Sequence, residues 1–170
     1  IRITRDPLLN KSNFISYAAS ASWHQEVRAA ADRARKHIDR YLGGLMEVVD
    51  PDAKIFIVAS GTAVSISRAA LGLLEKEGIR AGLIKIKSIR PFPAEELAKA
   101  TAHADLIVVP EFNAGGWLAR EIKAALDHNS RVVGGPRVFG GMTLPPELIV
   151  QEIRQQLSRR AADERGDYVE

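Results

Sequence analysis

Apolar residues form four short runs that predict β-strands. Residues 54–59 and 105–109 are apolar without polar alternation, which is typical of strands buried on both faces of a parallel sheet. Residues 81–89 alternate between apolar and polar positions, so one face of that strand is expected to be wet or docked to a partner. Residues 131–133 predict a short fourth strand, followed by a loop around Val138-Phe139 that contains Gly134, Gly135, Gly140 and Gly141.

Between these runs, apolar residues recur at the three- and four-residue spacing of helices. A first helix is predicted over 22–49, where Ser22 and Gln25 match a capping box. Further helices are expected between Thr62 and Gly78, over 94–102, over 117–127, and from near Pro145.

The alternation of strands and helices predicts the α/β class, as a three-layer α/β/α fold with a mostly parallel sheet and right-handed crossovers. Residues 1–21 lack a sustained period and are expected to form an extended arm or linker of a fragment or cleaved chain. Residues 22–158 are the predicted α/β domain, and 159–170 a charged tail.

Composition excludes several classes of function. The 24 basic and 21 acidic residues give a net charge of +3, which does not predict a nucleic-acid partner. No apolar run approaches the roughly 18 residues of a membrane span. The absence of cysteine excludes disulfides and iron–sulfur ligation by this chain, and the four histidines lack the spacing of a helical metal site, so no metal site is predicted. A cytoplasmic location is the expectation.

Candidate functional residues lie in the loops expected after the strands, where ligands and partners of such folds meet the sheet. Ser60-Gly61-Thr62 predicts a helix N-cap, or an anion contact through backbone N–H groups. Arg90 is expected to form a structural ion pair, with an acidic group across a domain interface or with Glu111, in preference to a ligand contact. Phe92, beside two prolines, is a candidate interface aromatic.

The loop before the 117–127 helix carries an acid and an amide, Glu111 and Asn113. Such pairs occur in acid–base catalysis, but a catalytic carboxylate needs burial to raise its pKa, and no nucleophile lies at readable spacing. No catalytic residue is therefore predicted. Gly115 and Gly116 precede Trp117, whose ring is expected either to pack under its own sheet or to anchor a subunit contact.

Several segments together resemble one enzyme family. Residues 84–93, which end in Arg-Pro-Phe-Pro, look like a strand and turn of the α subunits of 2-oxoacid:ferredoxin oxidoreductases, in their C-terminal, transketolase-C-like domain. Residues 53–74 and 106–126 are similar to the units before and after it. Gly140-Gly141 before Pro145 is similar to the closing segment. The resemblance covers about residues 22–157.

The resemblance implies a subunit or domain of a thiamine-diphosphate enzyme that oxidises a 2-oxoacid to an acyl-CoA and reduces ferredoxin. This chain is expected to act in assembly and orientation, as part of a hetero-oligomer, with ferredoxin only an indirect partner. It is expected to bind no cofactor alone, because it lacks a Gly-Asp-Gly motif. Thiamine diphosphate, Mg²⁺, iron–sulfur clusters and coenzyme A are expected elsewhere in the complex.

Two alternatives stay open, and so does the substrate. One is a similar C-terminal domain from a transketolase-like or E1β-like enzyme, and the other is a free-standing anion-binding α/β module. The 2-oxoglutarate-type chains are expected to have Gly-Gln after the acidic-x-Asn motif, where this chain has Ala114-Gly115. The particular 2-oxoacid is therefore not predicted.

Overall fold

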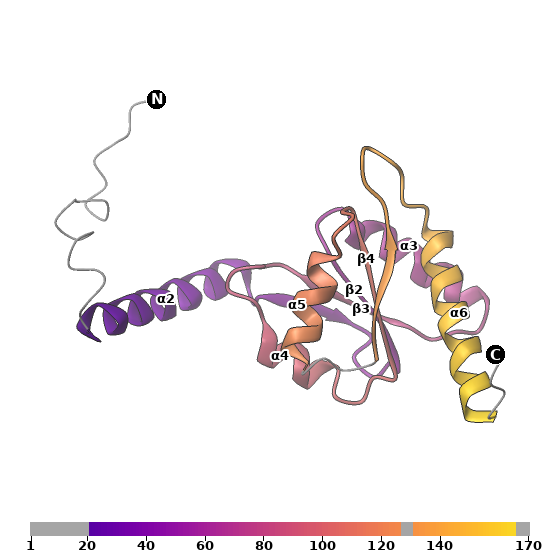
Figure 1. Ribbon diagram of the computed structural model, residues 1–170, viewed down its shortest axis with the longest axis horizontal. Coiled ribbons are helices and arrows are strands. Elements are labelled where there is room, and N and C mark those ends of the chain that lie inside the picture. The colour runs from indigo at the N-terminus through magenta and orange to yellow at the C-terminus, as the bar shows by residue number, and fades with distance from the viewer. Residues whose placement is uncertain (1–20, 127–130, 166–170) are drawn as a thin grey trace. The chain divides into compact units, whose positions relative to one another are not determined.

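The computed structural model describes residues 21–126 and 131–165. The chain divides into two compact units, Ile1–Gly43 and Gly44–Glu170. The described part of the first unit is helix α2 (Ala21–Leu42), on which Val27 and Tyr41 are 43% and 84% exposed (Figure 1). Within the described ranges, no helix has the length and apolar character needed to cross a bilayer. The predicted arm lies outside the described residues except for Ala21.

The second unit contains one five-stranded sheet. Its strands are β1 (Met46–Val49), β2 (Ile55–Ser60), β3 (Gly82–Ile86), β4 (Leu106–Glu111) and β5 (Val132–Arg137). They lie in the order β1-β3-β2-β4-β5, and all neighbours are parallel except β1, which runs antiparallel to β3. Because β2 to β5 are parallel, their carboxyl ends share one edge of the sheet.

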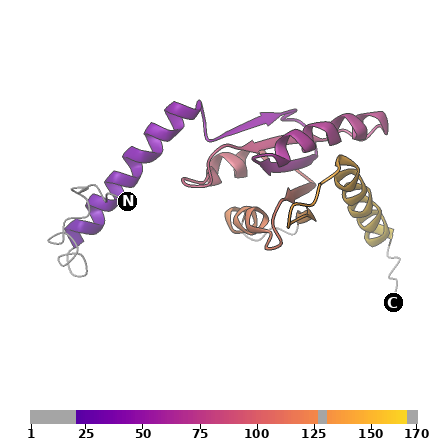
Figure 2. The same cartoon turned by 90° about the horizontal axis from the view of Figure 1, so that it is seen from above.

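Helices cover both faces of this sheet. They are α3 (Ala63–Lys76), α4 (Ala94–Ala100), α5 (Trp117–Ala125) and α6 (Pro146–Arg165). Helices α4 and α5 lie together on one side and α6 on the other, and the turned view keeps α5 and α6 on either side of β5 (Figures 1 and 2). The predicted three-layer α/β/α fold is confirmed.

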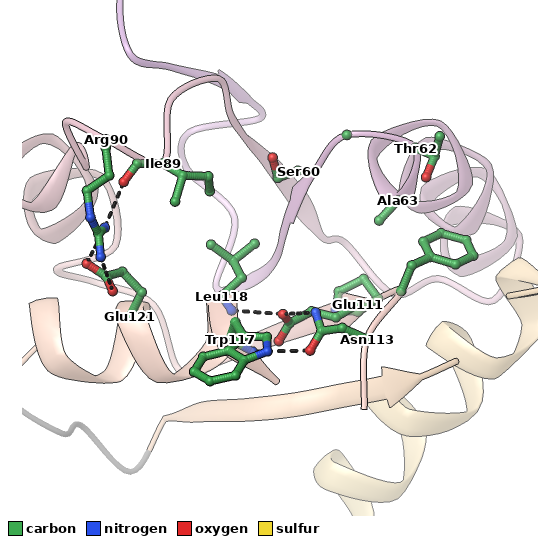
Figure 3. A pocket seen from close by; sticks show the side chains of 13 residues that line it. Ser60, Thr62, Ala63, Ile89, Arg90, Glu111, Asn113, Trp117, Leu118 and Glu121 are labelled. Atoms are coloured by element: carbon green, nitrogen blue, oxygen red, sulfur yellow. Dashed lines mark hydrogen bonds and ion pairs between the residues drawn. The ribbon is translucent and has the colours of Figure 1, made fainter. Parts of the chain in front are cut away.

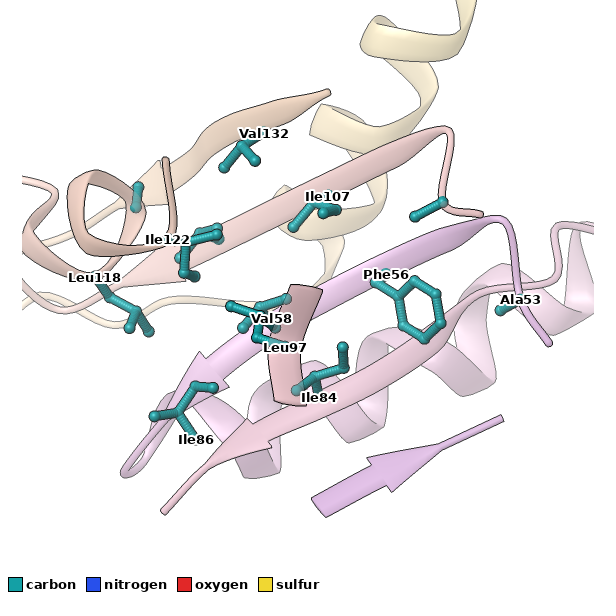
Figure 4. Close-up of a cluster of buried hydrophobic side chains, with 13 residues drawn as sticks. Ala53, Phe56, Val58, Ile84, Ile86, Leu97, Ile107, Leu118, Ile122 and Val132 are labelled. Atoms are coloured by element: carbon teal, nitrogen blue, oxygen red, sulfur yellow. The ribbon is translucent and has the colours of Figure 1, made fainter. Parts of the chain in front are cut away.

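Alternate residues of the strands pack into two separate hydrophobic cores. Phe56, Val58, Ile84 and Ile107 pack with Leu97 of α4 and with the inner face of α5 (Figure 4). The neighbouring strand positions pack against α3 and α6 on the other face. Ile57 and Val108 are fully buried, which confirms that the 54–59 and 105–109 runs are central strands. Burying one such side chain contributes roughly 1.5 to 3 kcal/mol relative to leaving it exposed.

The predicted helix 22–49 is wrong at its C-terminal end. Helix α2 ends at Leu42, and Gly43 and Gly44 follow with φ angles of 60° and 98°, a left-handed backbone that glycine adopts without steric cost. The next residues form β1, where Glu47 lies opposite Lys85, at 3.6 Å between carboxylate and ammonium. The polar face expected on the 81–89 strand is therefore partly covered by the neighbouring edge strand β1. The domain boundaries at 22 and 158 stay predictions.

Strand β5 is longer than the predicted 131–133. Gly134 and Gly135, which were expected in a loop, lie inside this strand. A Cβ at Gly135 would come within 2.8 Å of Val108 Cγ1 and 3.1 Å of the Pro110 nitrogen. Glycine is needed there for β4 and β5 to approach. Helix α6 continues to Arg165, through the first residues of the predicted charged tail. Helix α5 ends at Ala125, and the remainder of the predicted 117–127 helix includes Asp127, which is outside the described residues.

Candidate functional site

A pocket of about 500 Å³ opens where the carboxyl ends of β2 and β4 meet. Its walls come from the start of α3, the segment after β3, and the loop between β4 and α5. Figure 3 shows these side chains around the opening. The pocket brings together seven of the predicted candidates, which are Ser60, Gly61, Thr62, Arg90, Glu111, Asn113 and Trp117. It does not include Phe92, Gly115 or Gly116.

Glu111 and Asn113 form a capping network for α5. Glu111 is 5% exposed, and its carboxylate accepts hydrogen bonds from the backbone N–H of Leu118 at 2.8 Å and of Ala119 at 3.1 Å. The Asn113 amide donates to the same carboxylate at 2.8 Å. Its carbonyl oxygen accepts from the Gly116 N–H at 2.7 Å. These bonds satisfy N–H groups that a helix start leaves unpaired, so the acid–amide pair is structural here.

The φ of 62° at Gly116 turns the chain into α5. A Cβ at this residue would lie 3.2 Å from the Arg137 guanidinium carbon. At Gly115 a Cβ would lie 2.8 Å from the indole nitrogen of Trp117. The two glycines therefore leave room for an arginine and a tryptophan beside the helix start.

Arg90 forms the predicted ion pair, but with an unexpected partner. Its guanidinium donates to Glu121 of α5 at 2.9 and 3.3 Å, and to the Ile89 carbonyl at 2.8 Å. The expected pairing with Glu111 is wrong, because that carboxylate is already occupied by α5 N–H groups. The Arg90–Pro91 peptide bond is cis. The Arg90 side chain is 71% exposed, so the pair is a surface one.

The predicted N-cap at Ser60-Gly61-Thr62 is not formed by a side chain. Thr62 occupies the cap position of α3 but makes no side-chain cap hydrogen bond. The Ser60 hydroxyl instead donates to the Ile86 carbonyl at 3.1 Å, which ties β2 to β3. The Gly61 carbonyl accepts from the Val64 N–H at 3.2 Å, within a backbone turn.

Three aromatic residues in or beside the loops at the strand ends differ in exposure. Phe92 is partly buried and packs against the core on the α4 and α5 face. Phe112 is 40% exposed and Trp117 is 68% exposed, so Trp117 does not pack under its own sheet. The Arg120 guanidinium carbon lies 5.4 Å from the Trp117 ring centroid, within the range of a cation–π contact.

Sequence reasoning missed Arg120 and Arg137, whose guanidinium groups lie next to Trp117 and Gly116, respectively. The sequence signal for the position of Arg137 is the set of glycines that make room for it. Its guanidinium lies against Gly116 and Gly134 and donates to the Ala114 carbonyl at 3.4 Å. Two glycines in a strand beside a loop glycine are a signal of such a close approach. Chemically, this edge offers apolar surface and guanidinium groups.

Comparison with known proteins places the chain in a family. A family model described as pyruvate:ferredoxin oxidoreductase core domain II matches residues 53–159. The chain belongs to this family. The resemblance to 2-oxoacid:ferredoxin oxidoreductase α subunits, drawn above from the Arg-Pro-Phe-Pro turn and its neighbours, is confirmed.

Relatives and solved structures agree with the family. The pyruvate synthase subunit PorA of Methanothermobacter thermautotrophicus is 32% identical over 145 residues, covering 76% of this chain and 38% of that subunit. A 2-oxoglutarate:ferredoxin oxidoreductase from Magnetococcus marinus, solved with 2-oxoglutarate, coenzyme A and succinyl-CoA, is 25% identical with a TM-score of 0.63, over 80% of this chain and 23% of that one.

A split-gene transketolase shares the fold, with a TM-score of 0.55 at 24% identity over 66% of this chain and 42% of that one. This likeness supports the predicted transketolase-C-like fold. The present chain spans less than half the length of each of these proteins.

Proposed function

We propose that this chain is a domain or subunit of a thiamine-diphosphate-dependent 2-oxoacid:ferredoxin oxidoreductase. The observation that supports this most is the match of core domain II to residues 53–159, together with a PorA relative at 32% identity. Such an enzyme decarboxylates a 2-oxoacid oxidatively to an acyl-CoA and passes the electrons to ferredoxin. It works in the cytoplasm as a hetero-oligomer.

Within that enzyme, the chain shapes the assembly and orients neighbouring domains. Thiamine diphosphate is held through Mg²⁺, which prefers oxygen ligands such as carboxylates. In the described ranges, no group of three or more His, Asp or Glu side chains could hold a metal ion, and the buried Glu111 is occupied by α5. These residues do not fit the Mg²⁺ that holds the cofactor, so no step of the reaction is assigned to them. We propose that thiamine diphosphate and coenzyme A bind elsewhere in the complex.

The test is purification of the whole enzyme from its native host through an affinity tag on this chain, under anaerobic conditions. Copurifying subunits with iron–sulfur absorption are expected. The preparation should reduce methyl viologen with coenzyme A and one of pyruvate, 2-oxoglutarate or 2-oxoisovalerate. Ketol transfer between sugar phosphates without coenzyme A would favour the transketolase-like alternative. A chain that elutes alone and inactive would overturn the proposal.

A further inference from the structure

The exposed apolar side chains of the second unit gather on one edge. Among residues 44–126 and 131–165, all the large hydrophobic side chains recorded as exposed follow the carboxyl ends of parallel strands or lie in the first turn of the next helix. They are Ile89, Phe112, Trp117, Phe139, Met142 and Leu148. We call this set the strand-end surface. Exposed apolar side chains gathered on one side of a protein mark an interaction site.

One part of this surface is a turn that presents two apolar side chains outward. The Met142 N–H donates to the Phe139 carbonyl at 3.3 Å, and the residues between them, Gly140 and Gly141, have φ angles of 63° and 79°. Positive φ at both central positions is the type I′ geometry, which favours glycine. Phe139 and Met142 are 60% and 63% exposed. The turn thus leaves both side chains largely exposed to solvent.

Two arginines on the same edge give the surface its charge. Arg120 lies over the Trp117 ring, and Arg137 rests against Gly116 and Gly134. In the described part of the chain, no carboxylate lies within ion-pair distance of either guanidinium. Arg90, by contrast, is neutralised by Glu121. Two such guanidinium groups beside exposed apolar side chains suit a partner that brings carboxylates beside apolar side chains.

We propose that the strand-end surface docks an acidic and apolar segment from a neighbouring domain or subunit of the enzyme. The proposal rests on the proposed function, because that function supplies the neighbour. A second copy of this chain is a poorer occupant, since facing two such edges would bring like charges of Arg120 and Arg137 together. The apolar side chains supply burial, and the arginines select for carboxylates.

The first experiment identifies the segment by photocrosslinking in the intact enzyme. p-Benzoylphenylalanine replaces Phe139 in the tagged chain, and a matched control places it at Gln155, on the exposed face of α6. The expected product links position 139 to a peptide that contains Asp or Glu beside apolar residues, and position 155 does not give it. A crosslink to the same edge of a second copy, or to a neutral or basic peptide, would overturn the proposal.

The second experiment measures charge complementarity. In the tagged enzyme, Arg120→Glu together with Arg137→Glu is compared with Arg159→Glu, an exposed arginine on the part of α6 remote from the strand-end surface. The double variant should retain partner subunits about tenfold more weakly at low salt, with the difference shrinking as salt rises, while Arg159→Glu behaves as wild type. Circular dichroism checks that each chain is folded.

The two proposals fail in different ways. An active complex that is equally stable with all variants, and that yields no crosslink at position 139, would refute docking and leave the proposed function standing. A wild-type chain that copurifies with no partner would refute both.

Discussion

At the scale of single residues, Glu111 is a buried carboxylate whose oxygens are engaged by its own loop and helix. Three donors converge on it, two from the backbone of α5 and one from Asn113. Hydrogen bonds to a charged acceptor are stronger than neutral ones, and each is costly to lose once the group is buried. The acid–amide motif therefore stabilises the loop beside the pocket.

Replacing Glu111 by Gln is expected to lower the free energy of unfolding by roughly 1 to 3 kcal/mol, because an amide NH₂ would face an N–H donor. Urea denaturation of the 170-residue chain measures this. The matched control is Glu121→Gln, which breaks the exposed pair with Arg90 and should cost below about 1 kcal/mol. Equal costs for both variants would contradict the capping role.

At the scale of elements, the central strands and the helices between them could be predicted, because buried parallel strands are continuously apolar and their helices carry a regular stripe. Strand β1 could not, because its apolar residues continue the helical spacing of the preceding segment. Only the Gly43-Gly44 pair and the outward Glu47 mark the change. The predicted strand at the position of β5 was too short, because glycines in a sequence indicate a loop unless a close approach to another strand, here β4, requires them.

The partners of the strand-end residues were harder to predict than their location. That Ser60, Arg90 and Glu111 would line one edge follows from parallel topology, and the pocket confirms it. Which charges pair depends on helix placement: α5 brings Glu121 to Arg90 and its own N–H groups to Glu111. The spacing of residues in the sequence does not show which of these charged groups will pair.

Helices α3 and α6 are joined by an ion pair that should make their packing acid-sensitive. Hydrogen bonds from Arg154, one of them 2.7 Å long, lower the pKa of Glu77 below its usual 4.5; desolvation opposes this, and the attraction between the charges assists it. A lowered folded-state pKa contributes stability that is present above pH 4.5 and is lost as the pH falls through the lowered value.

Glu77→Gln should therefore destabilise the chain at neutral pH and have a smaller effect at an acidic pH below 4.5, because the stability that the lowered pKa contributes is lost as the pH falls through it. Urea midpoints at the two pH values, for wild type and variant, measure the difference. Glu75→Gln, an exposed change on the same helix, controls for the general effect of removing a negative charge. A Glu77→Gln effect that grows toward low pH would contradict the assignment.

At the scale of the whole molecule, the described part of the second unit gathers its exposed large apolar side chains at the edge where related α/β folds bind ligands. Parallel strands bring their carboxyl ends to one edge, and here that edge carries an occupied carboxylate, a surface ion pair and six exposed hydrophobic side chains. Such an edge suits contact with a protein surface better than it suits the binding of a polar cofactor. The proposed division of labour, with assembly here and chemistry elsewhere, follows from that distribution.

The corresponding prediction is that the 170-residue chain alone does not bind thiamine diphosphate. Isothermal titration calorimetry with thiamine diphosphate and Mg²⁺ should give no binding heat, and the melting temperature should not rise, since a ligand stabilises a protein only if it binds the folded form. The control is the purified complex stripped of cofactor, which should regain both signals. Micromolar binding to the isolated chain would place the cofactor on this domain and contradict the division of labour, whatever the outcome for the strand-end surface.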